Sequence, residues 1–149
     1  MKTLTQLQSS KLNRKKINAF SVFIVEDNPT YSFMLSYNLE QEFNFNISSF
    51  DSGEDCLLNI EQQRPTIIIL DYKLKNMDGV SVLQYVKRNY PEIYVIVLTE
   101  QKNISTAVNI MKRGAFDYLQ KSKTSLDELR NSIYKIFVDI NVNEQKRMN

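Results

Sequence analysis

Five polar side chains in this chain of 149 residues stand at or just past the end of short apolar runs typical of buried strands. They are Glu26, Asp27, Asp71, Thr99 and Lys121. Each alone would be ordinary at a strand end, but three neighbouring carboxylates repel one another unless a divalent cation lies between them, and an oxygen-only set suits Mg2+. A carboxylate can also accept a phosphoryl group, whose oxygens a hydroxyl and an ammonium group would hold. The set therefore predicts a Mg2+ and phosphoryl site.

The composition excludes several other chemistries. The chain has no histidine, so it has no imidazole base, no histidine metal ligand and no phosphohistidine of its own. Its single cysteine, Cys56, can form neither an internal disulfide nor a C-x-x-C pair, and we expect it in the core. The three glycines form no glycine-rich phosphate loop, so side chains and a metal must hold any phosphoryl group. No apolar run approaches a membrane span or a secretory signal, and we expect a cytoplasmic protein.

Apolar runs alternate five times with helical patterns along the chain. The predicted strands cover residues 20–25, 45–50, 66–70, 93–98 and 116–119. Because helical crossovers are right-handed and join parallel strands, this alternation predicts a (βα)5 α/β fold with a doubly wound, five-stranded parallel sheet. In such sheets the site lies beyond the carboxyl ends of the strands, where the five polar residues fall.

Apolar residues at helical spacing indicate an apolar side for the helices between the strands. The residues with this spacing are Phe33, Met34, Tyr37 and Leu39 in the first helix and Ile104, Val108 and Met111 in the fourth. The last helix is predicted to begin near Ser125 and to give way to a polar, frayed tail after Asp139.

The charge of the chain is unevenly distributed. Residues 1–18 hold five basic residues and no acid, so the remaining chain is mildly acidic although the formal net charge is +2. We expect residues 1–18 to be a solvated basic extension, residues 19–140 to form the domain and residues 141–149 to be a polar tail. A nucleic-acid partner would depend on the extension alone and is not expected.

In order, spacing and strand context, these residues resemble the receiver domain of two-component response regulators. The resemblance covers about residues 20–139. Besides Thr99, it rests on the acidic pair Glu26-Asp27, on the segment DYKLKNMDG at 71–79 and on the segment GAFDYLQK at 114–121. It implies a flavodoxin-like sheet of order 2-1-3-4-5, in which the first and third strands are neighbours and bring their acids to one point.

The resemblance also implies a role for each site residue. Asp71 would accept a phosphoryl group from the phosphohistidine of a sensor histidine kinase or histidine phosphotransfer protein. The implied Mg2+ ligands are Glu26, Asp27, Asp71 and the main-chain carbonyl of Lys73. Thr99 and Lys121 would contact the phosphoryl oxygens, and Tyr118 matches the aromatic that moves inward with Thr99. A switch on the face of the fourth helix, fifth strand and fifth helix would then reach a downstream protein partner or a second copy of the chain.

Three positions depart from the usual pattern of this family. Ser122 follows Lys121 where a proline in a cis peptide is common, which leaves a trans or a strained bond as alternatives. Lys75 replaces a proline that often stiffens the loop, which predicts a more mobile loop. Glu100 replaces a small residue and could crowd or repel a phosphoryl donor, so Glu100→Ala is predicted to speed phosphorylation from small donors. We expect Glu100, Lys73 and Ser122 to modulate the reaction.

The function expected from the sequence is therefore a stand-alone phospho-acceptor regulator, which at most catalyses its own phosphorylation and dephosphorylation. Two alternatives remain open: a docking module that works without phosphorylation, and a receiver fragment of a longer response regulator. A metal-dependent phosphatase would need a D-x-D pair, whereas Asn28-Pro29 follows Asp27. A flavodoxin-type flavin site would need a Ser/Thr/Gly phosphate loop there, which is also missing.

Overall fold

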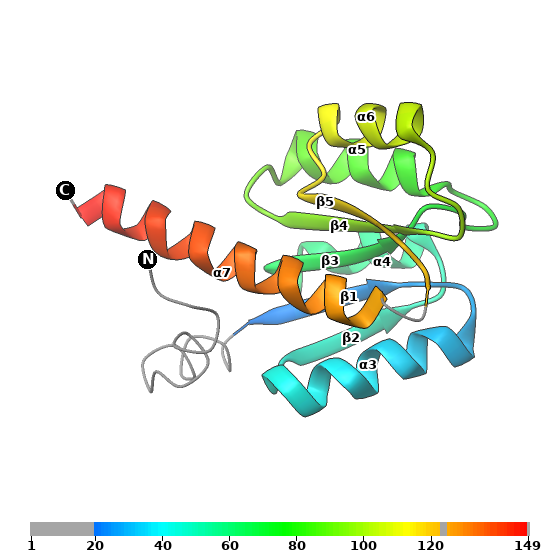
Figure 1. The fold of residues 1–149 in the computed structure, drawn as a ribbon, viewed down its shortest axis with the longest axis horizontal. Coiled ribbons are helices and arrows are strands. Elements are labelled where there is room, and N and C mark those ends of the chain that lie inside the picture. Colours follow the sequence, from blue (N-terminus) through cyan, green and yellow to red (C-terminus); the bar gives the residue numbers. More distant parts are fainter. Residues whose placement is uncertain (1–19, 123–124, 149) are drawn as a thin grey trace.

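The computed structural model describes residues 20–122 and 125–148, and the predicted basic extension at 1–18 lies outside them. Within the described chain, five parallel strands form one sheet in the order β2-β1-β3-β4-β5 (Figure 1). This confirms the predicted doubly wound α/β fold and its strand order. The carboxyl ends of all five strands point the same way, so the residues at these ends share one edge of the sheet.

The strands are β1 Ser21–Val25, β2 Asn46–Phe50, β3 Ile67–Asp71, β4 Tyr94–Thr99 and β5 Asp117–Gln120. Three of them extend one residue further than the sequence predicted. The reason is that Asp71 still pairs with Leu98, and Thr99 still pairs with Gln120. Asp71 and Thr99 are therefore held by the sheet itself, which fixes their backbones more firmly than a loop would.

The sheet divides the core into two layers. In β1, Val22 and Ile24 face one layer and Phe23 and Val25 face the other, as the two-residue period of a strand requires. All five residues of β3 are buried, as expected for a central parallel strand covered on both faces. Burying each isoleucine of such a strand contributes about 1.5–3 kcal/mol, so β3 is a firm support for Asp71 at its end.

Five helices cover the two faces of the sheet in the described chain. They are α3 Pro29–Phe43, α4 Gly53–Ile60, α5 Gly79–Asn89, α6 Ile104–Lys112 and α7 Ser125–Met148. Helices α3 and α7 pack on one face, and α4, α5 and α6 pack on the other (Figure 1). A side chain caps the start of each of the first four: Asn28, Ser52, Asp78 and Asn103 each accept a hydrogen bond from the backbone N–H three residues on.

The expected apolar side was wrong for α6 and only half right for α3, where Leu39 is buried and Met34 packs against the core as predicted. Helix α3 buries Leu35, Leu39 and Phe43 at a four-residue spacing, whereas Phe33 is 71% exposed and Tyr37 is also exposed. In α6 the predicted residues Ile104, Val108 and Met111 are all exposed, Ile104 by 85%, and Ile110 is the buried one. The residues of each helix that face the sheet are thus shifted around the helix from the predicted side, by part of a turn in α3.

The last helix is longer than predicted. Helix α7 continues to Met148 instead of giving way to a frayed tail after Asp139, and Figure 1 shows its last turns beyond the sheet. The Tyr94 hydroxyl donates a hydrogen bond of 2.5 Å to Asp139 Oδ2, which ties the start of β4 to this part of the helix. Within the described chain, no helix is long and apolar enough to span a bilayer.

Cys56 lies in the core, as predicted. Its side chain projects from α4 into the core cluster that also holds residues of β1 and α5, and burial raises the pKa of its thiol to about 12. At neutral pH the sulfur is a protonated, inaccessible packing group, because thiolate chemistry needs a lowered pKa and exposure.

Candidate phosphoryl-acceptor site

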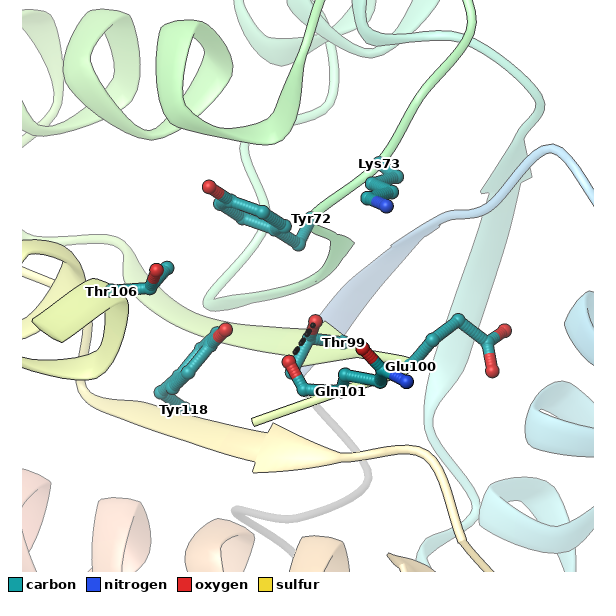
Figure 2. Close-up of a pocket in the computed structure, with 7 residues that line it drawn as sticks. All are labelled: Tyr72, Lys73, Thr99, Glu100, Gln101, Thr106 and Tyr118. Carbon is teal, nitrogen blue, oxygen red and sulfur yellow. Dashed lines mark hydrogen bonds between the residues drawn. The ribbon is translucent and has the colours of Figure 1, made fainter. Parts of the chain in front are cut away.

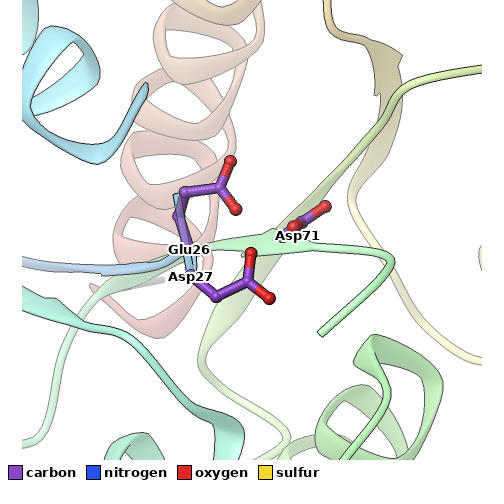
Figure 3. Close-up of side chains that lie close together, drawn as sticks. All are labelled: Glu26, Asp27 and Asp71. Carbon is purple, nitrogen blue, oxygen red and sulfur yellow. The ribbon is translucent and has the colours of Figure 1, made fainter. Parts of the chain in front are cut away.

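The five predicted site residues meet at the carboxyl edge of the sheet. Glu26 and Asp27 follow β1, Asp71 ends the neighbouring strand β3, and Thr99 ends β4. Lys121 follows β5, and its backbone N–H donates to the Thr99 carbonyl at 2.7 Å. Two close-ups show this edge: Figure 2 shows Thr99 with the residues around a neighbouring cavity, and Figure 3 shows the three acids.

The three acids form a cluster of carboxylates. One carboxylate oxygen from each of Glu26, Asp27 and Asp71 lies within 4.8 Å of the other two. In Figure 3 the side chains of Glu26 and Asp27 both extend toward the side on which Asp71 lies. Glu26 and Asp71 are buried, and Asp27 is partly exposed.

The surroundings of Glu26 disfavour its negative charge, which a bound cation would stabilise. Burial and the neighbouring Asp71 together raise the pKa of Glu26 to about 7, against the opposing effect of Lys121. Its Oε2 atom has no hydrogen-bond partner among the described residues. A buried carboxylate oxygen without a partner is costly, and a divalent cation would satisfy it. The donor set therefore fits Mg2+: three carboxylates, offered as oxygen ligands at one point.

Lys121 lies against the same acids. Its Nζ is 2.5 Å from Glu26 Oε1, 3.2 Å from Asp71 Oδ1 and 4.6 Å from the centre of the Tyr31 ring. Burial alone would lower the pKa of Lys121, but its hydrogen bond to Glu26 and the charge of Asp71 outweigh burial and raise it. The ammonium group is therefore charged, and it lies within ion-pair distance of both buried acids.

The loop after Asp71 folds back over this residue. The Lys73 backbone N–H donates to Asp71 Oδ1 at 3.3 Å. The start of α5 lies so close that a Cβ on Gly79 would be 2.5 Å from the Asp71 carbonyl oxygen. Glycine at position 79 thus lets the helix approach the backbone of Asp71, which explains why DYKLKNMDG ends in glycine.

Thr99 and Tyr118 face a cavity beside Asp71. The cavity holds about 380 Å3 and is lined by Tyr72, Lys73, Thr99, Glu100, Gln101, Thr106 and Tyr118 (Figure 2). The Thr99 hydroxyl donates to the Gln101 carbonyl at 3.2 Å, so it is engaged with its own loop. Tyr118 is buried, and its ring meets that of Tyr72 edge-on at 6.3 Å between centroids. Tyr118 therefore occupies an inward position.

Two of the three departures from the family pattern are clarified. The described residues contain no cis peptide bond, so the bond from Lys121 to Ser122 is trans. The Glu100 side chain is exposed, and its Oε1 lies 3.9 Å from Lys121 Nζ. In Figure 2 it extends away from Tyr72 and Tyr118 rather than into the cavity between them. Lys75 is exposed, and the predicted mobility of its loop stays a prediction.

The sequence pattern did not reveal four residues at this edge: Tyr31, Tyr72, Gln101 and Thr106. Tyr31 could have been noticed, because it lies in the first turn of a helix that begins directly after the acidic pair. Tyr72 follows the strand and has no periodic signal. Gln101 takes part through its backbone carbonyl, which no side-chain pattern reports.

Several known proteins are similar to this chain in both sequence and fold. The nitrogen assimilation regulatory protein NtrX of Azorhizobium caulinodans is 34% identical over 105 residues, which are 69% of this chain and 23% of that protein. A DNA-binding response regulator of the LuxR family from Staphylococcus aureus is 26% identical, with a TM-score of 0.72 over 78% of this chain and 98% of that chain. The Mn2+-bound form of response regulator Rcp1 is 25% identical, with a TM-score of 0.66 over 76% of this chain and 88% of that one.

The chain spans under a quarter of the length of the curated relatives that it matches. A family model described as the response regulator receiver domain matches residues 22–134, which include all five site residues and the whole sheet except Ser21. Receiver domains are phospho-acceptor signalling modules that interact with histidine kinases or phosphotransfer proteins, and they generally bind Mg2+ at an acidic pocket. This chain belongs to the receiver domain family of two-component response regulators.

Proposed function

We propose that this chain accepts a phosphoryl group on Asp71 from the phosphohistidine of a sensor histidine kinase or a histidine phosphotransfer protein. The observation that carries the proposal is the position of Asp71 beside the carboxylates of Glu26 and Asp27, with the ammonium group of Lys121 3.2 Å from its Oδ1. An Asp71 oxygen attacks phosphorus, the P–N bond breaks, and its electron pair stays on the departing histidine nitrogen. The donor must be another molecule, because this chain has no histidine.

Mg2+ would be held by Glu26, Asp27, Asp71 and the main-chain carbonyl of Lys73, and when bound it would offset the negative charge of the phosphoryl oxygens. The unpartnered Oε2 of Glu26 supports this assignment, as does the Mn2+-bound form of the related Rcp1. Lys121 contributes a fixed positive charge to the same oxygens. It is already held in place by Glu26, so little rearrangement is needed to receive the phosphoryl group.

The signal would leave through a change at Thr99. To reach a phosphoryl oxygen, the Thr99 hydroxyl must give up its bond to the Gln101 carbonyl, which moves the loop that leads into α6. Tyr118, already inward, would fix the new arrangement of that loop. The output face would comprise α6, β5 and α7, where the exposed Ile104, Val108 and Met111 offer apolar contacts to a downstream protein or a second copy of the chain.

The experiment is to incubate the protein with Mg2+ and phosphoramidate and to measure its intact mass. We expect one added phosphoryl group on the wild type and none on Asp71→Asn. Asp51→Asn, a change of an exposed aspartate that follows β2 at the same edge of the sheet, is the matched control and should be labelled like the wild type. A wild type that stays unlabelled, under conditions that label a known receiver, would favour a docking module that works without phosphorylation.

Besides the stand-alone regulator and the docking module, this sequence could be the receiver part of a longer regulator, and the length of the relatives favours this alternative. The matched segment covers 23% of NtrX and 21% of the NtrC-type relative from Proteus hauseri, which is described as a DNA-binding transcriptional regulator. In such an arrangement the phosphoryl chemistry at Asp71 is unchanged, and the output face acts on a covalently attached domain. Size determination of the protein in cell extract distinguishes the two forms.

A further inference from the structure

Glu100 places a negative charge at the mouth of the phosphoryl site. Its side chain is 74% exposed, whereas those of Lys121 and Asp71 are 8% and 7% exposed. The Glu100 carboxylate lies 3.9 Å from Lys121 Nζ, and that nitrogen lies 3.2 Å from the acceptor oxygen of Asp71. From Asp71 outward, the charges are thus a buried acid, a buried ammonium group and an exposed acid.

The order of these charges determines which part of a donor each one meets. In an in-line displacement the leaving group departs opposite the attacking oxygen. Because Asp71 is buried, the opposite side is the solvent side, where Glu100 lies. Lys121 therefore acts on the phosphoryl oxygens, which all donors share, while Glu100 acts on the leaving group, which differs between donors.

Two classes of donor carry opposite charge in the leaving group. In an acyl phosphate the P–O bond breaks and its electron pair departs on a carboxylate, so negative charge grows beside Glu100. In a protonated phosphoramidate or phosphoimidazole the P–N bond breaks, the electron pair stays on nitrogen, and a neutral amine or imidazole leaves. The nitrogen group is positive until that bond breaks, so it is attracted to Glu100 throughout the approach.

We propose that Glu100 makes this site select nitrogen-linked phosphoryl donors over acyl phosphates. The inference deepens the proposed function and rests on it. One unit of charge difference at about 5 Å in a nearly aqueous environment corresponds to a selectivity of about three- to tenfold in the second-order rate constant of phosphorylation. An exposed carboxylate is screened by salt, so the selectivity falls at high ionic strength. Lys73 lines the same cavity and carries the opposite charge, so the relevant quantity is the change when Glu100 is neutralised.

The test compares acetyl phosphate with phosphoramidate on the full chain in Mg2+ at matched ionic strength, with phosphorylation rates taken from intact mass. Glu100→Gln keeps the size of the side chain and removes its charge, while Glu100→Ala removes both. We expect Glu100→Gln to lower the ratio of the phosphoramidate rate to the acetyl phosphate rate about three- to tenfold, and added salt to lower this ratio for the wild type only. Glu92→Gln, an exposed acid at the opposite end of β4, should leave the ratio unchanged.

Three results would overturn the inference. If Glu100→Gln changes both rates by the same factor, Glu100 acts through Lys121 on the phosphoryl oxygens and does not sense the leaving group. If Glu100→Gln changes neither rate and Glu100→Ala speeds both, the side chain only crowds the donor. If neither variant changes either rate, the carboxylate points away from the donor in solution. A wild type that takes no phosphoryl group from either donor would instead contradict the proposed function itself.

Discussion

Lys121 and Glu26 are 95 residues apart in the sequence, yet the ammonium nitrogen of one lies 2.5 Å from Oε1 of the other in a buried contact. The contact joins the loop after β5 to the end of β1, at opposite sides of β3 and β4 in the sheet order. It also holds the positively charged Nζ of Lys121 close to Asp71, 3.2 Å from its Oδ1. This pair is therefore expected to contribute to the local stability of the edge and, under the proposed function, to the charge that an incoming phosphoryl group would meet.

Replacing Lys121 with alanine should lower the free energy of unfolding by about 2 kcal/mol in the absence of metal, because Glu26 and Asp71 would be left as neighbouring buried acids. Mg2+ should restore part of this loss by taking the place of the positive charge. Urea unfolding without Mg2+ and with Mg2+ at about tenfold above its apparent Kd measures both effects. Lys135→Ala, an exposed lysine on α7, is the control and should change the free energy little. A loss for Lys121→Ala no larger than the control would contradict the role of the pair.

Binding of Mg2+ should weaken as the pH falls below about 7. The pKa of Glu26 is raised from 4.5 to about 7, so without metal Glu26 favours the folded state most below pH 4.5, and this contribution is lost as the pH rises through about 7. A metal binds the deprotonated form and must compete with the proton. The apparent Kd should rise about tenfold from pH 8 to pH 6, as followed by the Mg2+-dependent shift in Tm.

Glu26→Gln is the control for this pH dependence. It removes the titrating group, so it should bind Mg2+ weakly and with little difference between pH 6 and pH 8. An equally steep pH dependence in this variant would assign the titration to another group.

Gly79→Ala should destabilise the protein and disturb the acceptor. The added Cβ would lie 2.5 Å from the Asp71 carbonyl oxygen and 3.0 Å from the backbone of Tyr72, and backbone cannot move aside cheaply. We expect a loss of about 2–4 kcal/mol in the free energy of unfolding and a slower phosphorylation of Asp71. Gly53→Ala is a matched comparison, because its Cβ would meet a side-chain atom, Val82 Cγ2, at 2.6 Å. It should cost less, and a larger loss at Gly53 would refute this explanation.

Much of the fold and of the site could be predicted because both depend on apolar runs and on the polar residues directly after them. Runs such as Ile67-Ile68-Ile69-Leu70 can only be buried, and parallel strands must end at one edge, which brings Asp71 and Thr99 together without any knowledge of side-chain packing. The ends of β3, β4 and β5 were predicted one residue too early, because backbone pairing continues through the polar residues there. Backbone pairing cannot be recognised from residue types alone.

The covered faces of helices could not be predicted in the same way. Helix α6 has nine residues, and its apolar side chains lie on more than one side. The spacing of Ile104 and Val108 therefore fits a helix face as well as the spacing of the apolar residues around Ile110 does. Contact with α5 and the sheet selects Ile110, and that information is not local. The end of α7 was missed because its last turns are polar, although their Glu, Gln, Lys and Arg favour helix, and because the bond from Tyr94 to Asp139 is long-range.

Thr99→Ala should separate phosphorylation from signalling. The variant keeps Asp71 and Lys121, so intact mass should still show one phosphoryl group, added about tenfold more slowly because one contact to its oxygens is lost. The loop into α6 would no longer be drawn toward the site, because the hydroxyl that now donates to the Gln101 carbonyl is missing. Amide NMR shifts of residues 104–112 should therefore respond to phosphorylation in the wild type and in Thr99→Ser, which keeps the hydroxyl, but only weakly in Thr99→Ala. A full NMR response in Thr99→Ala would show that phosphorylation of Asp71 changes the output face without the Thr99 hydroxyl. The edge-on ring contact between Tyr72 and Tyr118 would then be the next candidate to test.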